Sequence, residues 1–187
     1  VIGAILATSR PASSPFHLSI MSPATCLNIL LIEDNPADAD FLQEIAEELD
    51  TCIWNITHVE RLADGLAHLQ TQVFDIILLD LSLPDAQGLG MIPQIQQITP
   101  SVPIVVLTGW NDERVGVEAL RCGVQDFLVK GQIEPWLLVR TVHFAIERVR
   151  AQQVIQQQST AISAARDGIA ILNANWHYTY VNQAYAA

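Results

Sequence analysis

Cysteine and basic residues are scarce in this sequence, and each shortage argues against a class of protein. The three cysteines, Cys26, Cys52 and Cys122, are odd in number and unclustered. They argue against a disulfide framework or a zinc site and suit free thiols in a reducing cytoplasm, where we expect the protein to be. Nine basic residues stand against 20 acidic ones, for a formal net charge of −11. Because so acidic a surface repels phosphate backbones, we expect no nucleic acid partner.

Long hydrophobic runs are also missing. A membrane-spanning helix takes about 20 consecutive apolar residues, and because no stretch of the sequence reaches that length, we expect no membrane partner. Val1–Ala7 is apolar, but it is too short for the core of a signal peptide and no basic residue precedes it. We interpret residues 1–24 as a disordered leader, with Met21 as the hypothetical natural start.

Short apolar runs alternate with helical patterns over residues 25–150. The runs predict five buried strands: Leu27–Ile32, Ile53–Val59, the run that ends at Asp80, Pro103–Thr108 and Asp126–Val129. Helical spacing of apolar residues follows the first four runs, in segments that begin at Pro36, Leu62, Met91 and Glu113. This alternation predicts an α/β fold, a flavodoxin-like (βα)5 doubly wound parallel sheet with strand order 2-1-3-4-5. The second run is less apolar, so we expect it nearer the sheet edge.

From Pro135 onward the pattern predicts one long C-terminal connector helix that continues past the domain. Residues 151–162 are Gln-rich and sparsely apolar. We interpret them as a helical linker, which is either solvated or paired with a second copy of the chain. Residues 163–187 contain two short strand-like runs about a turn at Asn173–Trp176, too short to bury a core by themselves.

Polar side chains lie where the predicted strands end. Glu33 and Asp34 follow the first strand, Asp80 ends the third, Thr108 ends the fourth and Lys130 follows the fifth. The carboxyl ends of parallel strands share one edge of the sheet, where ligands bind near the switch point. Each residue alone has an ordinary explanation, such as a solvated strand end or a helix-start acid. Together, however, four strand ends carry suitable polar residues in the right order along the chain, and this combination favours a ligand-binding site.

The chemistry of these five residues suits a phosphoryl group. Three converging carboxylates repel one another unless a cation or protons intervene. They are few, hard oxygen donors, which suits Mg²⁺. The cation, Lys130 and the hydroxyl of Thr108 together form a cradle for phosphoryl oxygens. Asp80 is central and can accept phosphate as an acyl phosphate.

Four motifs resemble the receiver domain of two-component response regulators, over about Cys26–Ile155. They are the acidic pair in LLIEDNPAD, DLSLPDAQG around Asp80, LTG at Thr108 and FLVKG at Lys130. The resemblance implies that Asp80 is the phosphoacceptor and that a histidine kinase or phosphotransfer protein is the donor.

The same resemblance implies a role for each matching residue. Mg²⁺ would be bound directly by Asp34 and Asp80, through water by Glu33, and by the carbonyl group of Ser82. Thr108 and Lys130 would hold the phosphoryl oxygens, and Phe127 would be the switch aromatic that turns inward with the threonine. Ser82 and Trp110 occupy positions that tune dephosphorylation.

Three residues depart from the family pattern. Gly131 stands where many receivers have proline, which puts a cis peptide bond after Lys130 in doubt. Phe127 has no hydroxyl group, so it cannot form a switching hydrogen bond. Bulky Trp110 near the mouth of the site is expected to slow the attack of water.

The last segment, DGIAIL, a turn and YTYVNQAYA, resembles the beginning of a PAS sensor domain, although Asn175 and Trp176 depart from the usual turn. The resemblance implies that residues 163–187 are an N-terminal fragment of a PAS-like domain in a larger protein. By itself the fragment is expected to be disordered or to leave unpaired strand edges. The alternative is an ordinary amphipathic tail.

The sequence thus predicts a phosphorylation switch, not an enzyme that turns over a separate substrate, whose last helix relays a conformational change to a PAS or output region. A homodimer through that helix is compatible with the pattern. Alternatives are a degenerate receiver that only binds proteins, or the N-terminal part of a larger hybrid sensor kinase or cyclic-di-GMP enzyme. A dehalogenase-type phosphatase would need an aspartate in place of Ser82, and a nucleotide or flavin module would need glycines in the first loop, EDNPADAD.

Overall fold

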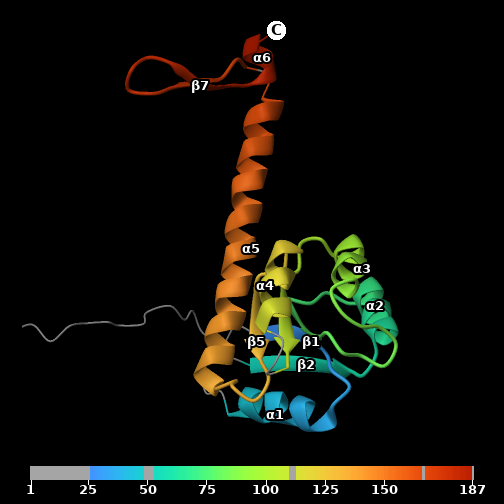
Figure 1. Cartoon of the computed structure of the whole chain (residues 1–187). Helices are drawn as coiled ribbons and strands as arrows, with labels where there is room; N and C mark the ends of the chain where they lie inside the picture. The colour runs from blue at the N-terminus through green and yellow to red at the C-terminus, as the bar shows by residue number, and fades with distance from the viewer. Residues whose placement is uncertain (1–25, 49–52, 110–112, 166, 187) are drawn as a thin grey trace, which may run out of the picture.

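A computed structural model describes residues 26–48, 53–109, 113–165 and 167–186, so the predicted leader lies outside the described residues. The central sheet is parallel, with strand order β2-β1-β3-β4-β5 (Figure 1). Its strands are β1 (Cys26–Ile32), β2 (Ile53–Val59), β3 (Ile76–Asp80), β4 (Ile104–Thr108) and β5 (Asp126–Val129). The five helices around it are α1 (Pro36–Glu47), α2 (Leu62–Thr71), α3 (Met91–Ile98), α4 (Glu113–Arg121) and α5 (Pro135–Ala164). The predicted fold and strand order are confirmed.

Helices cover both faces of the sheet, because β1 sends alternate side chains to opposite sides. Ile29 and Leu31 pack in a core with residues of α1 and α5. Leu30 and Ile32 pack in a second core with residues of α2, α3 and α4. None of these four residues has any exposed surface. A strand buried on both faces has consecutive apolar residues, as in Ile29–Ile32, and this pattern identified β1 in the sequence.

The carboxyl ends of the central strands lie at the same edge of the sheet. Ile32, the last residue of β1, pairs with Leu79 of β3, and Asp80 pairs with Leu107 of β4. Both β3 and β4 are buried along their whole length. In β2, at the sheet edge, only Trp54 is buried, which confirms the place predicted for the least apolar strand.

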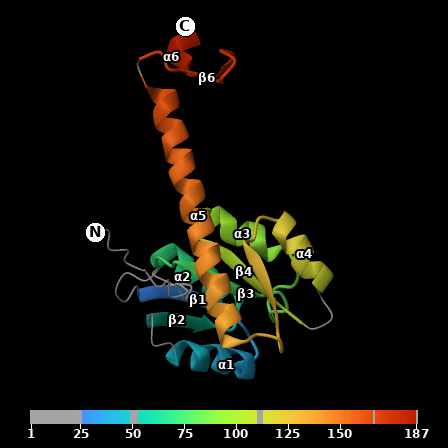
Figure 2. The same ribbon diagram turned by 90° about the vertical axis from the view of Figure 1, so that its left-hand side faces the viewer.

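Helix α5 has a packed half and a projecting half. Leu138, Val142 and Ile146 are buried against the sheet, whereas every residue from Arg150 to Ala161 is exposed. The projecting half carries the chain well beyond the sheet in both views (Figures 1 and 2). The predicted continuation of the helix past residue 150 is confirmed. No helix in the described ranges combines the length and hydropathy needed to cross a membrane.

The last described segment forms a small hairpin at the far end of α5. Strands β6 (Ala170–Leu172) and β7 (Tyr178–Val181) pair antiparallel, and the short helix α6 (Gln183–Ala186) follows. The two predicted strand runs and their turn are confirmed. The fragment was expected either to be disordered or to leave unpaired strand edges. The structure shows unpaired edges, because within the described residues each strand of this two-stranded sheet pairs on one edge only.

Asn182 ties this hairpin to α5. Its side chain is 2% exposed, although most residues around it are exposed. The amide nitrogen donates hydrogen bonds to the carbonyl oxygens of Ile162 (3.2 Å) and Asp167 (2.9 Å), and the amide oxygen accepts one from the backbone N–H of Ile169 (2.8 Å). A single polar side chain therefore satisfies backbone groups on both sides of the junction.

The thiol groups agree with the sequence. Cys26 and Cys122 are free, as predicted, and both are exposed. Cys52 lies outside the described residues.

The N-terminus of α2 is capped from another part of the chain. Arg61, at the capping position, makes no side-chain hydrogen bond to the helix. Instead the carboxylate of Asp85, in the loop after β3, accepts hydrogen bonds from the backbone N–H groups of Leu62 (3.0 Å) and Ala63 (2.9 Å). These hydrogen bonds, chiefly the one from Ala63, hold the pKa of Asp85 below its ordinary value of 3.8. Asp85 thus fixes the loop after β3 against α2.

Replacing Asp85 with alanine is expected to lower the free energy of unfolding at neutral pH by about 1 kcal/mol. Because the pKa of Asp85 is lowered in the folded state, its contribution is present above the unfolded-state pKa and is lost as pH falls through the folded-state pKa. Urea titrations at several pH values should show the difference shrinking below about pH 4. The control is Asp40→Ala, an exposed site in α1. A difference independent of pH would contradict this account.

Candidate functional site

Three carboxylates meet at the edge where β1 and β3 end. Glu33 and Asp34 directly follow β1, and Asp80 is the last residue of β3. One carboxylate oxygen from each lies within 4.8 Å of those of the other two. Glu33 is fully buried and Asp80 is 4% exposed, whereas Asp34 is exposed. The predicted convergence of these three acids is therefore observed.

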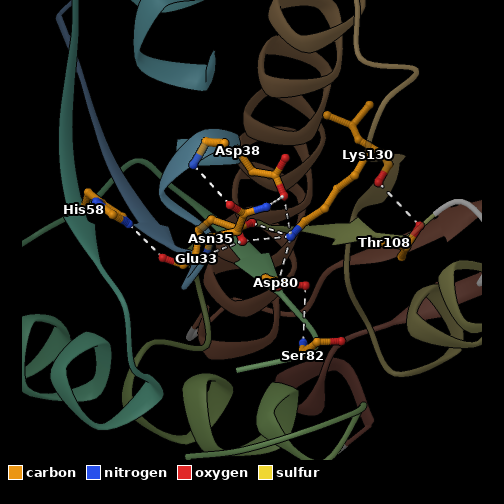
Figure 3. A network of polar contacts seen from close by, with 10 residues as sticks. Glu33, Asn35, Asp38, His58, Asp80, Ser82, Thr108 and Lys130 are labelled. Atoms are coloured by element: carbon orange, nitrogen blue, oxygen red, sulfur yellow. Dashed lines mark hydrogen bonds and ion pairs between the residues drawn. The ribbon is translucent and has the colours of Figure 1, made fainter. Parts of the chain in front are cut away.

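Lys130, directly after β5, is the only lysine in the sequence, and it reaches into this cluster (Figure 3). Its Nζ lies 2.7 Å from Oε2 of Glu33 and 3.0 Å from Oδ2 of Asp80. A third carboxylate oxygen, Oδ2 of Asp38 in α1, lies 3.2 Å from the same nitrogen. One ammonium group thus joins β1, α1 and β3 to β5.

Burial and charge act in opposite directions on these groups. Burial raises the pKa of Glu33, and the negative charge of Asp80 raises it further, while the hydrogen bond from Lys130 opposes both. Burial lowers the pKa of Lys130, but its hydrogen bonds and ion pairs with Glu33 and Asp80 outweigh burial and raise it above 10.5. Lys130 is therefore a fixed positive charge at neutral pH.

The edge strand β2 holds the backbone of Glu33. The N–H of Glu33 donates a hydrogen bond to the carbonyl group of Val59 (3.0 Å), and Nε2 of His58 lies 2.8 Å from the carbonyl oxygen of Glu33. Oε1 of Glu33 also accepts a hydrogen bond from the N–H of Asn35 (3.1 Å). The buried acid is thus held by its main chain as well as by its side chain.

His58 and Asp38 are site residues that were not predicted from the sequence. The signal for Asp38 was present, since it is an acid in the first turn of the helix that leaves the acidic pair. His58 gave no such signal, because a histidine near the end of an edge strand is usually only a surface residue.

Ser82 and Thr108, two other predicted site residues, lie near the acidic cluster, but their side chains do not bind its carboxylates. The backbone N–H of Ser82 donates to Oδ1 of Asp80 at 3.2 Å, and the Ser82 side chain is exposed. Thr108 is 2% exposed, and its hydroxyl donates to the carbonyl oxygen of Leu128 in β5 at 3.4 Å. The Thr108 hydroxyl is thus engaged by the neighbouring strand.

Phe127 is half-buried against α4. A Cβ atom at Gly116 would lie 2.4 Å from the Phe127 ring, so this glycine makes room for the ring. Trp110 lies outside the described residues. Among the described residues there is no cis peptide bond, and Gly131 adopts φ 80°.

The donor set fits a hard divalent cation. All three acids offer oxygen ligands, and exposed Asp34 leaves room for water, which Mg²⁺ retains when it binds proteins. Oε2 of Glu33 is fully buried and is ion-paired with Lys130 at 2.7 Å. A carboxylate oxygen has more than one acceptor position, so a water bound to the cation can share this oxygen with Lys130.

Comparisons with known proteins agree with this geometry. A sequence model of the response regulator receiver domain matches residues 29–142. The transcriptional regulatory protein KdpE of Staphylococcus aureus is 36% identical over 102 residues, covering 54% of this chain and 42% of that protein. The swarming motility regulation protein RssB of Serratia marcescens is 33% identical over 114 residues, covering 61% and 51%. ZraR of Salmonella typhimurium is 27% identical over 104 residues, covering 56% of this chain and 23% of that regulator.

Solved structures show the same fold. A CheY-like response regulator receiver domain protein from Methanospirillum hungatei has a TM-score of 0.60 and 20% identity, covering 68% of this chain and 99% of that one. The receiver domain of a signal transduction histidine kinase from Syntrophus aciditrophicus has a TM-score of 0.56 and 26% identity, covering 66% and 92%. The chain spans only 23% to 51% of the length of the curated relatives named above.

Replacing Lys130 with methionine is expected to lower the free energy of unfolding at pH 7 by about 1–3 kcal/mol, because it leaves buried acids without a countercharge. Burial already raises the pKa of Glu33 in the folded protein, and losing Lys130 raises that pKa further, so the folded variant binds more protons and the loss shrinks as pH falls. Chemical denaturation from pH 7 to pH 4.5 measures it. Arg150→Met is the matched control, since Arg150 pairs with Glu147 on the surface. An equal loss in both variants would contradict this expectation.

Proposed function

Because the chain belongs to the response regulator receiver domain family, we propose that it accepts a phosphoryl group on Asp80 from a histidine kinase or phosphotransfer protein. The observation that carries this proposal is the position of Asp80, nearly buried at a strand end, with Lys130 3.0 Å from its Oδ2. A carboxylate oxygen of Asp80 attacks phosphorus, and the bond between phosphorus and the donor histidine nitrogen breaks. The chain turns over no separate substrate in this role.

The acceptor is oriented before the transfer. The N–H of Ser82 binds Oδ1 of Asp80 and Lys130 binds Oδ2, so the side chain is held at both oxygens. Asp34 and Asp80 would hold Mg²⁺ directly, Glu33 through water, and Ser82 through its carbonyl group. When bound, the cation supplies positive charge that attracts the phosphoryl oxygens to an acidic edge.

Thr108 and Phe127 would convert phosphorylation into a change of shape. The long hydrogen bond from Thr108 to Leu128 is weak enough to exchange for one to a phosphoryl oxygen. As Thr108 moves, the ring of Phe127 turns inward and leaves the face of Gly116, which biases the position of α4. Ser82 and Trp110 are proposed to set the rate at which water removes the phosphoryl group.

We propose the domain limits that the sequence predicts: a receiver domain over residues 25–150, a helical linker over 151–162 and a PAS-like fragment over 163–187. The hairpin supports the last assignment, because Ile171, Tyr178 and Val181 are exposed apolar or aromatic side chains that a larger domain would cover. In this arrangement α5 relays the change of shape to the PAS-like region and to whatever output follows.

We further propose that the projecting half of α5 pairs with that of a second copy. From Ala151 to Ala165 the sequence contains no charged residue, while the chain as a whole carries a net charge of −11. Two copies therefore repel each other least along this segment, where Ile155 is 66% exposed. Such a pair would bring two linkers and two hairpins together.

The phosphorylation proposal is tested by intact mass spectrometry after incubation with acetyl phosphate and Mg²⁺. The expected result is the gain of one phosphoryl group, abolished by Asp80→Asn and by EDTA. Asp85→Asn is the matched control, since it changes a nearby aspartate outside the acidic cluster and should still be phosphorylated. If neither acetyl phosphate nor a panel of phosphorylated histidine kinases labels the protein, the chain is instead a receiver that only binds proteins.

Pairing through α5 is tested by introducing a cysteine in place of Gln158 in a chain whose natural cysteines are replaced. Mild oxidation should then link two copies, because parallel helices place equivalent residues together. The matched control is a cysteine in place of Gln43, in α1. A monomeric mass by light scattering together with no cross-link would reject the pair.

A further inference from the structure

Asp38 is a fourth carboxylate at the site, and it lies outside the cluster that could hold a cation. Asn35 caps α1 by accepting a hydrogen bond from the N–H of Ala37 (3.1 Å). Its amide nitrogen donates to Oδ2 of Asp38 at 2.9 Å, the same oxygen that lies 3.2 Å from Nζ of Lys130 (Figure 3). The sequence Asn35-Pro36-Ala37-Asp38 thus forms a rigid helix start that holds Asp38 beside the lysine.

The ammonium group of Lys130 is fully engaged in this arrangement. An ammonium has three N–H donors, and three carboxylates surround this one: Glu33, Asp38 and Asp80. A phosphoryl group on Asp80 brings new oxygens that need a donor from Lys130. No other lysine exists in the chain to supply it. One of the existing partners must therefore release the ammonium.

The three carboxylates differ in the free energy that each loses when its ion pair with Lys130 breaks. The side chain of Glu33 has no exposed surface, so losing its countercharge would leave a buried charge unpaired. Asp80 carries the phosphoryl group itself. The side chain of Asp38 is 35% exposed and keeps its bond from Asn35, so water can replace the lysine there at little cost. Asp38 is therefore the carboxylate whose ion pair with Lys130 breaks most easily.

We propose that Asp38 is a positioning residue that competes with the phosphoryl group for Lys130 and so weakens the hold of the site on that group. The proposal rests on the proposed function, since it concerns the phosphorylated site. While Asp38 is present, the ion pair between Lys130 and Asp38 must break before Lys130 can bind the phosphoryl oxygens, and this reduces the net free energy of that binding. Removing the charge of Asp38 leaves Lys130 anchored by Glu33 and able to donate to the phosphoryl oxygens on Asp80.

The test is the affinity for beryllofluoride, a phosphoryl analogue, measured by calorimetry at saturating Mg²⁺. Asp38→Asn is expected to bind the analogue about two- to fivefold more tightly than wild type, the size of a partly exposed ion pair. Its affinity for Mg²⁺ alone should not increase, because a nearby negative charge is lost. The matched control is Asp40→Asn, the same charge change at an exposed site in α1, which should bind like wild type. Asp38→Glu should return the affinity toward wild type.

A second comparison separates competition for Lys130 from a general effect of charge. In a Lys130→Met background, Asp38→Asn should give no tighter binding, because the contested group is gone. Tighter binding in that background, or an equal gain from Asp40→Asn, would mean that only net charge matters and would overturn the proposal. So would unchanged or weaker binding by a folded Asp38→Asn variant. If wild type binds no beryllofluoride and accepts no phosphoryl group, the proposed function itself fails, and this inference with it.

Discussion

One ammonium group among carboxylates is the interaction on which the site depends. Glu33 and Asp80 are buried acids at the ends of adjacent strands, and without a positive charge between them their proximity would be unfavourable. Lys130 supplies that charge from a position 97 residues along the chain from Glu33. The parallel sheet makes this contact possible, because it brings the ends of β1, β3 and β5 to one edge. The hydrophobic cores on both faces of the sheet keep those ends in place.

The fold was predictable because each buried strand is a short apolar run with a turn signal after it. The same strand ends predicted the approach of Glu33, Asp34, Asp80 and Lys130, since register carries their side chains to one edge. Exact strand limits shifted by a residue, with β1 beginning at Cys26 and β4 at Ile104. Such small differences are expected, because strand ends are defined by single hydrogen bonds.

Contacts that depend on side-chain direction were not predictable. His58 reaches Glu33 and Asp38 reaches Lys130 only because of the rotamers chosen between neighbouring elements. The hydroxyl of Thr108 was expected at the phosphoryl site, yet it bonds to the adjacent strand, a choice that sequence cannot reveal. Asn182 is similar, since its burial depends on backbone groups up to 20 residues away.

The continuous helix α5 also sets an angular phase between the sheet and the hairpin. An α-helix turns by about 100° and rises about 1.5 Å per residue. One residue inserted into the exposed half would rotate the hairpin by about a quarter of a circle, whereas seven residues would nearly restore its direction while moving it outward by about 10 Å. The length of this uncharged segment therefore encodes orientation, and its composition is freer to vary than its residue count.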